Sequence, residues 1–121
     1  MRPRGYRDEC TFGPPQMSRE LLPARRACRT MTVTALNQSM IMSVGYYPDG
    51  RPGEVFCSNN KSGTEADALA RDAAVAVSMC LQHGVQLETL AKAVTRERDG
   101  SASSLMGKLL DKLIEDQKAD E

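Results

Sequence analysis

The sequence predicts an α+β fold in which a three-stranded antiparallel meander is followed by two or three helices packed on one face. Three observations predict it. Between residues 31 and 57, apolar and polar residues alternate in short runs separated by turn-forming residues, which is typical of half-buried strands. After residue 62, apolar residues recur at steps of three and four, as in amphipathic helices. Because the strands precede the helices, the order favours an α+β domain over a parallel βαβ array.

The first strand begins where threonines start to alternate with apolar side chains. In the second strand, Met40 and Met42 lie on the same face and are expected to fill the core. Turn-forming residues separate the runs, and Gly50 suits a positive φ. The three strands are expected at 31–35, 39–46 and 53–57. The two turns are expected at Asn37–Gln38 and Pro48–Asp49–Gly50.

The long helix that follows is expected to start at an S-x-x-E capping box, formed by Ser62 and Glu65, and to end after about 20 residues at His83–Gly84. Its apolar stripe should pack on the sheet. The stripe consists of Ala66, Leu69, Ala70, Ala73, Val77, Cys80 and Leu81.

Two further helices are expected on the same core. The first spans about 86–95 and is followed by a solvated loop at 96–100. The second is capped by serines at 101–104. It carries Leu105, Met106, Leu109, Leu110, Leu113 and Ile114. This stripe either completes the core or covers a copy of itself in a homodimer.

A chain of 121 residues is long enough for one domain and one modest core. Residues 1–29 hold four of the six prolines and seven arginines, so they are expected to form an irregular arm, with disorder as the alternative. An α+β domain is expected at 30–117, with its core at 30–95 and a terminal helix at 103–117. Residues 118–121 form an acidic tail.

Composition excludes several partners. Acidic and basic residues balance at 16 each, so no overall field draws the protein to nucleic acid or to a membrane surface. The longest apolar run, 73–81, is too short to span a bilayer, and residues 1–15 lack the apolar region of a secretory signal. A cytoplasmic location is therefore expected.

An arginine patch near the N-terminus could contact nucleic acid or an acidic partner. Because the chain has only five aromatic residues, a platform on which bases stack is not expected. The patch comprises Arg19, Arg25, Arg26 and Arg29.

Catalytic signatures are missing from the sequence, and no catalytic residue or metal ligand is expected. The single histidine, His83, suits a helix terminus, with a general-base role as the alternative. Asp67 and Asp72 are expected to be solvated. The cysteines form no C-x-x-C pair, which argues against a zinc site. They are Cys10, Cys28, Cys57 and Cys80, and the last two are expected in the core.

One polar loop is the candidate binding site. It brings a lysine, hydroxyls and backbone N–H groups to the start of the long helix, where phosphate, carboxylate or a nucleotide would be attracted. The alternative is that these residues only cap the helix. The candidate residues are Asn60, Lys61, Ser62, Gly63 and Thr64.

Several of these segments together resemble the TSCPD domain. They are V-G-Y-Y-P-D-G-R-P-G-E-V-F at 44–56, K-S-G at 61–63, the alanine-rich helix and following turn at 73–85, and Leu87–Glu88. The TSCPD domain is found at the C-terminal end of adenosylcobalamin-dependent ribonucleotide reductases and as short stand-alone proteins. The resemblance covers about residues 30–95.

The resemblance implies limited chemistry for this chain. In the full reductases a separate, larger barrel binds adenosylcobalamin and nucleotide, so no cofactor is expected on this chain alone. The reductases also carry redox cysteines near the C-terminus, whereas residues 96–121 here hold none, and the Thr-Ser-Cys-Pro-Asp signature is missing after the second helix. A dithiol relay is therefore not expected, and any ribonucleoside-diphosphate reductase label would follow from similarity alone.

Three functional hypotheses follow. The first is a stand-alone module, accessory or regulatory in deoxyribonucleotide and DNA synthesis, that partners a ribonucleotide reductase catalytic subunit and is not catalytic alone. The second is a nucleotide- or phosphate-binding module that uses residues 61–63. The third is an interaction protein that forms a homodimer through residues 103–117.

Overall fold

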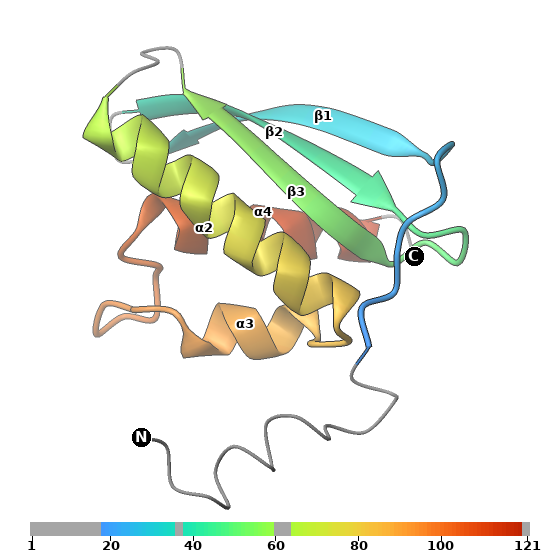
Figure 1. Cartoon of the computed structure of the whole chain (residues 1–121). Helices are drawn as coiled ribbons and strands as arrows, with labels where there is room; N and C mark the ends of the chain where they lie inside the picture. Colours follow the sequence, from blue (N-terminus) through green and yellow to red (C-terminus); the bar gives the residue numbers. More distant parts are fainter. Residues whose placement is uncertain (1–17, 36–37, 60–63, 120–121) are drawn as a thin grey trace, which may run out of the picture.

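The computed structural model describes residues 18–35, 38–59 and 64–119, and it confirms the predicted α+β class. The three helices lie on one side of the sheet, with α3 farthest from it (Figure 1). The elements are β1 (Cys28–Ala35), β2 (Gln38–Tyr46), β3 (Pro52–Asn59), α2 (Glu65–Gln82), α3 (Leu87–Ala93) and α4 (Leu105–Ala119).

The sheet has the order β1-β2-β3 with both pairs antiparallel. In the registers, Thr32 lies opposite Ile41 and Ser43 lies opposite Phe56. A bulge interrupts the β2–β3 ladder between Gly45 and Tyr46. The first strand begins three residues earlier than predicted because the alternation continues through Thr30 to Cys28, where Gly45 of β2 provides a partner.

The core lies between the inner face of the sheet and the helices. Met40 and Met42 are both 1% exposed, as predicted. Burying side chains of this size contributes about 1.5–3 kcal/mol each. The other buried hydrophobic residues of this cluster are Val33, Val44, Val55, Cys57, Ala70, Ala74, Val77, Leu81, Leu87, Ala91, Leu109, Leu110 and Leu113.

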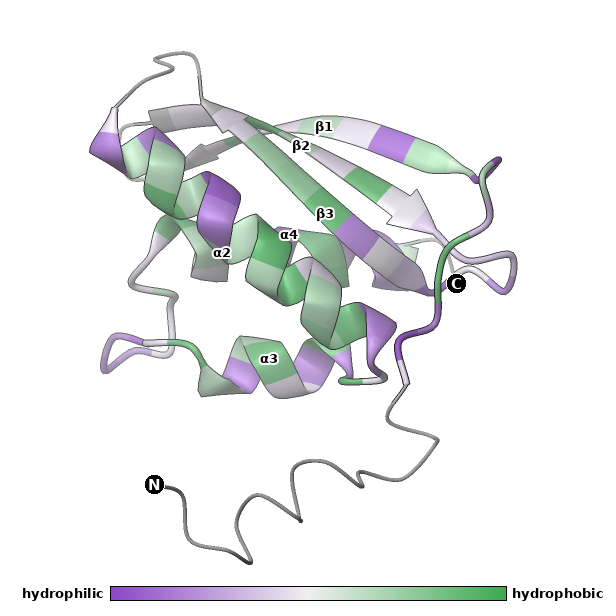
Figure 2. Ribbon diagram, viewed as in Figure 1, coloured by the Kyte–Doolittle hydropathy of each residue, from purple (hydrophilic) through white to green (hydrophobic). Residues whose placement is uncertain are grey.

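The predicted apolar stripe of α2 is wrong in part, because the helix is rotated about its axis. Ala66 is exposed and Leu69 is 65% exposed, whereas Asp67 and Gln82 are buried. Gln82 and Ser78 occupy the sheet-facing side because they find hydrogen-bond partners on β3, at Gly53 and Val55 respectively. Figure 2 shows hydrophobic residues along most of the length of α2. The buried face consists of Asp67, Ala70, Ala74, Val77, Leu81 and Gln82.

The predicted capping residue of α2 is also wrong. Thr64, with φ −88° and ψ 161°, is the N-cap, and its hydroxyl accepts the backbone N–H of Asp67 at 3.1 Å. Asp67, expected to be solvated, pairs with Arg71 at 2.9 Å. Asp72 is exposed as predicted. A carboxylate and a threonine hydroxyl in the first turn stabilise the helix start in the way that the sequence assigned to Ser62 and Glu65.

The C-terminal end of α2 agrees with the sequence. His83 is the C-cap, and Gly84 follows with φ +93°, a conformation that favours glycine. The Nδ1 atom of His83 lies 2.8 Å from the carbonyl oxygen of Met79. The His83 side chain therefore contacts a carbonyl group of the last turn of the helix.

The last two helices differ from their predicted bounds. The helix α3 is shorter than 86–95, and α4 runs to Ala119, past the predicted end at residue 117. Ser104 accepts the N–H of Gly107 at 3.0 Å and starts α4. The loop at 96–100 is not wholly solvated, because Arg96 is half-buried against α4. The buried residues of α4 complete the chain's own core, and the homodimer through 103–117 stays a prediction. None of the helices among the described residues has the length and apolar character that crossing a membrane requires.

Candidate functional site

The connection between β2 and β3 is a tight turn whose backbone is closed at both ends. Gly50 donates its N–H to the carbonyl of Tyr47 at 2.9 Å, and Tyr47 donates to the carbonyl of Arg51 at 2.9 Å. Pro48 sets the first central φ of the turn. Gly50 has φ +94°, which an L side chain rarely adopts. The P-D-G segment predicted as a turn is therefore confirmed in detail.

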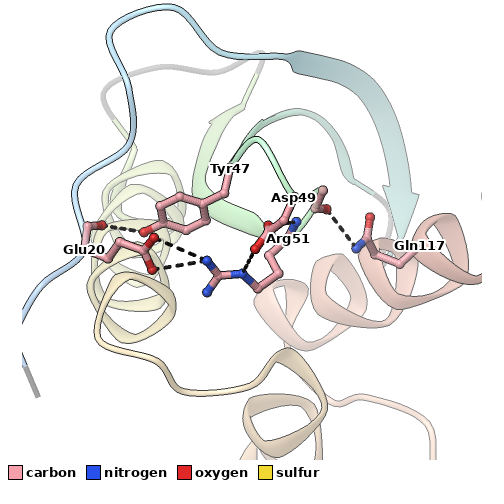
Figure 3. Close-up of polar contacts among 6 residues, drawn as sticks. Glu20, Tyr47, Asp49, Arg51 and Gln117 are labelled. Carbon is pink, nitrogen blue, oxygen red and sulfur yellow. Dashed lines mark hydrogen bonds and ion pairs between the residues drawn. The ribbon is translucent and has the colours of Figure 1, made fainter. Parts of the chain in front are cut away.

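Arg51 joins the polar side chains around this turn (Figure 3). Its Nε donates to Asp49 at 2.7 Å, and its backbone N–H donates to the same carboxylate at 3.0 Å. Its Nη2 atom reaches the carboxylate of Glu20 at 3.2 Å, and its guanidinium lies 4.6 Å from the centre of the Tyr47 ring. These contacts fix one orientation of the guanidinium, which combines ion pairs with a cation–π contact.

The charges of the turn agree with these contacts. Hydrogen bonds from the backbone and side chain of Arg51 hold the pKa of Asp49 below its usual value. The hydrogen bond to Asp49, followed by that to Glu20, raises the pKa of Arg51. Burial raises the pKa of the Tyr47 phenol. The Arg51, Asp49 and Glu20 side chains stay about half exposed, so their ion pairs contribute little stability and remain accessible to a partner.

Residues far apart in the sequence hold this turn. The hydroxyl of Tyr47 donates to the carbonyl of Glu20, and the N–H of Glu20 donates to the carbonyl of Gln82 at 2.7 Å. Gln82, 5% exposed, donates to the carbonyl of Gly53 at 2.9 Å. A Cβ at Gly53 would lie 2.6 Å from the Tyr47 ring, so only glycine lets that ring pack there. The described part of the arm is thus attached to the end of α2.

Beside the turn lies a groove of about 660 Å³, which we call the arginine groove. Its lining includes Arg25, Arg26 and Arg29, the turn at 48–50 and Gln117 of α4. Arg26 pairs with Glu54 at 2.7 Å and Arg29 pairs with Asp116. The groove therefore offers cationic side chains that are partly balanced by carboxylates of the same chain.

Of the predicted binding residues, only Thr64 is described. Asn60, Lys61, Ser62 and Gly63 lie outside the described residues, so the anion site stays a prediction. Thr64 caps α2, which agrees with the capping alternative for that residue. The arginine groove contains Arg25, Arg26 and Arg29 of the arginine patch predicted as a contact surface, whereas the Glu20–Arg51 contact was missed as a site. The D-G-R-P motif was the available signal, but its partners lie tens of residues away along the chain.

The described cysteines are unpaired by disulfides. Cys28 is exposed, Cys57 is buried and Cys80 is half-buried. Burial raises the pKa of the Cys57 thiol to about 11, so it remains protonated at neutral pH. Within the described ranges, no cluster of three or more His, Cys, Asp or Glu side chains could hold a metal ion.

The sequence has recognisable relatives. A family model of the TSCPD domain matches residues 6–117. A vitamin B12-dependent ribonucleotide reductase of Agrobacterium fabrum is 35% identical over 89 residues, which are 74% of this chain and 7% of the relative. Reductases of the same description from Rhodopirellula baltica and Streptantibioticus cattleyicolor are 34% and 35% identical over 80 residues, 66% of this chain and 8% and 13% of those proteins. No solved structure matches the chain. The chain thus corresponds to a small part of each reductase.

Proposed function

The chain belongs to the TSCPD domain family, and from this premise we propose that it is an accessory or regulatory module in deoxyribonucleotide and DNA synthesis. It binds a ribonucleotide reductase catalytic subunit and has no catalytic activity alone. The relatives are whole reductases, of which this chain matches 7–13%. The match therefore supports a role beside the catalytic machinery of such an enzyme.

The observation that carries the proposal is the fixed geometry around Arg51. Its guanidinium is held by Asp49, Glu20 and the Tyr47 ring, yet its side chain is 51% exposed. A preorganised arginine loses little conformational entropy when a partner covers it, and arginine is one of the residue types that dominate the energy of many interfaces. Tyr47 is 4% exposed, and its ring serves to hold the guanidinium in place. The turn is therefore suited to recognition of a protein surface.

The buried Cys57 supports a role in which this thiol takes no part in redox chemistry. A thiol that exchanges disulfides needs an accessible thiolate. Cys57 is 6% exposed and its pKa is raised to about 11. This cysteine is suited to packing under the sheet and not to electron transfer.

We propose that the cofactor, adenosylcobalamin, is bound by the partner and not by this chain. The arginine groove measures about 660 Å³, a size typical of drug-sized ligands. A corrinoid with its nucleotide tail is much bulkier, and the exposed arginines of this groove do not match its large apolar faces. This mismatch at the arginine groove supports the proposal that the cofactor lies on the partner.

The proposal is tested by binding of the full chain to the reductase of the same cell, measured by calorimetry. We expect Arg51→Ala to weaken binding at least tenfold and Arg98→Ala to leave it unchanged. Arg98 is an exposed arginine in another loop, so Arg98→Ala removes the same positive charge as Arg51→Ala at a different place on the surface. Circular dichroism checks that both variants fold. If wild-type protein does not bind, or if both variants bind equally well, the proposal fails.

A second measurement concerns catalysis. The purified chain, supplied with adenosylcobalamin, a dithiol and ribonucleoside diphosphates, is expected to give no deoxyribonucleotide. Measurable turnover that persists after further purification would contradict a non-catalytic role.

A second candidate function is nucleotide or phosphate binding, and the arginine groove favours it together with the predicted site at 60–64. Guanidinium groups bind phosphate with two parallel hydrogen bonds. A ligand at 100 times its Kd would raise the stability of the fold by about 2.7 kcal/mol. Thermal melts with nucleoside diphosphates and pyrophosphate test this. Arg25→Ala should abolish the shift if the groove binds, and Lys61→Ala if the loop binds. An unchanged melting temperature with every ligand excludes both sites.

A further inference from the structure

The two edges of the sheet are treated differently by the rest of the chain. At β3, the edge is covered by side chains of α2. The hydroxyl of Ser78 accepts the N–H of Val55 at 2.8 Å, and its single proton lies between the carbonyl oxygens of Ala74 and Val55, at 2.8 and 3.1 Å from the hydroxyl oxygen. Gln82 donates at 2.9 Å to the carbonyl of Gly53, which lies two residues before Val55 on β3 and also points away from β2. These side chains occupy positions that an added strand would need.

The opposite edge, β1, presents backbone groups to solvent. The N–H of Tyr46 donates to the carbonyl of Ala27 at 3.0 Å, which fixes the phase of the β1–β2 ladder. Hydrogen-bonded and non-hydrogen-bonded pairs alternate in an antiparallel ladder. The residues at 29, 31 and 33 therefore bond to β2, whereas the N–H and C=O groups of Thr30, Thr32 and Thr34 point away from it.

No hydrogen bond joins those outward backbone groups to any residue that the structure describes. The side chains of the same threonines are engaged on the outer face of the sheet, where Thr30 lies 3.2 Å from the Ser43 hydroxyl and Thr34 lies 3.4 Å from the Ser39 hydroxyl. The side chains therefore leave the backbone edge accessible.

Most of the devices that usually prevent pairing of an edge strand are missing from β1, and its one charged residue, Arg29, is paired with Asp116. Proteins block such edges with proline, lysine, bulges or very short strands. The sequence C-R-T-M-T-V-T-A is eight residues long and holds neither proline nor lysine, and its ladder with β2 is regular. The bulge of this sheet lies in the β2–β3 ladder, between Gly45 and Tyr46. An exposed edge of this kind is a template for another strand.

We propose that β1 pairs with β1 of a second copy of this chain, antiparallel across a two-fold axis, so that the sheet continues from one protomer into the other. The proposal is independent of the proposed function. A two-fold axis brings identical surfaces together, so the surface must be complementary to itself. The residues of β1 meet this requirement.

Pairing centred on Thr32 keeps both rows of side chains matched. On the helix side, Met31 lies opposite the partner's Val33, which extends the apolar row of the core. On the outer side, Thr30 lies opposite the partner's Thr34, and such threonine pairs are favourable across strands. Arg29 is the one charged residue of β1. It lies opposite Ala35, and its own Asp116 neutralises it, so no like charges meet.

The experiment measures the mass of the full chain by sedimentation across a wide concentration range, together with hydrogen exchange of individual amides by NMR. We expect a concentration-dependent rise from the chain mass of 13.2 kDa to twice that value. The outward amides of Thr30, Thr32 and Thr34 should exchange at least tenfold more slowly in the dimer than in dilute monomer. The amide of Met31, which bonds within the sheet, should be protected in both.

Thr32→Pro is the decisive variant because it removes an outward N–H and leaves the β1–β2 hydrogen bonds in place. It should remain monomeric at concentrations where Thr32→Ala, which keeps the N–H, still dimerises. A wild-type chain that stays monomeric overturns the proposal. So does a dimer that persists in Thr32→Pro, or a dimer in which the outward amides exchange as fast as in the monomer. If Thr32→Pro does not fold, the exchange measurement on wild-type protein decides the question.

Discussion

Arg96 donates hydrogen bonds to both carboxylate oxygens of Asp111, at 2.8 and 2.7 Å, and so joins the loop after α3 to α4. Its Nε also donates to the carbonyl of Ala91 at 3.1 Å. A lysine cannot reproduce this planar arrangement. We expect Arg96→Lys to lower the free energy of unfolding because the bidentate contact is lost, and urea denaturation measures the change.

The control for this variant is Arg98→Lys, because Arg98 is exposed in the same loop. Exposed surface substitutions of this kind change stability by about 0.5 kcal/mol or less. Equal effects of the two variants would show that the Arg96 contacts do not stabilise the junction of α3 and α4.

The same pair predicts a pH dependence. The hydrogen bond from Arg96 lowers the pKa of Asp111 below 3.8. Because the folded pKa is depressed, the unfolded state binds more protons in this range, so the contribution is complete above the unfolded pKa and is lost as the pH falls through the folded value. The stability difference between wild type and Asp111→Asn should therefore be constant from pH 5 to 7 and shrink below about pH 4. Urea titrations at each pH measure it. A difference that stays constant down to pH 2.5 would contradict this assignment.

Thr64 supplies a third prediction. Its hydroxyl accepts the N–H of Asp67 and caps α2, and loss of such a cap costs about 1 kcal/mol. Thr64→Ala should lower the unfolding free energy by about that amount, whereas Thr64→Ser, which keeps the hydroxyl, should be close to wild type. If serine and alanine are equally destabilising, the methyl group and not the hydroxyl is what matters there.

The order and type of the elements could be predicted because they depend on local patterns. Alternation gave the strands, and glycine at positions 50 and 84 marked ends that the structure confirms. Periodicity could not predict which side of α2 packs on the sheet. Apolar residues surround much of this helix, so its rotation is decided by polar contacts to the sheet, such as Ser78 with Val55, that form only in the folded chain.

The rotation of α2 makes a fourth prediction, which compares two leucines on one helix. Leu81 is 5% exposed and Leu69 is 65% exposed. Leu81→Ala should cost about 2–5 kcal/mol because it removes packing in the core, whereas Leu69→Ala should change the unfolding free energy by about 0.5 kcal/mol or less. Chemical denaturation measures both. If both leucines faced the sheet, as the apolar periodicity predicts, both variants would lose about 2–5 kcal/mol of unfolding free energy.

The candidate site was harder to predict than the fold, for a physical reason. The D-G-R-P motif was recognisable as a turn, but the role of Arg51 depends on Glu20, which is 31 residues away. Glu20 is placed in turn by its hydrogen bond to Gln82 at the end of α2. A sequence pattern contains no signal for such contacts. They arise where the arm, the turn and the helix end meet in the folded chain.

Cys57 supplies the last prediction, which concerns reactivity. The thiolate is the form that reacts, and with a pKa of about 11 roughly one Cys57 side chain in a thousand is ionised at pH 8. Cys57 is also buried, whereas Cys28 is exposed. In native protein treated with iodoacetamide at pH 8, peptide mapping should find Cys28 modified at least a hundredfold faster than Cys57. In urea the two rates should converge, because unfolding removes the burial that separates them. Rapid labelling of Cys57 in the native state would show that the inner face of β3 opens to solvent. Burial would then no longer argue against a redox role for this thiol.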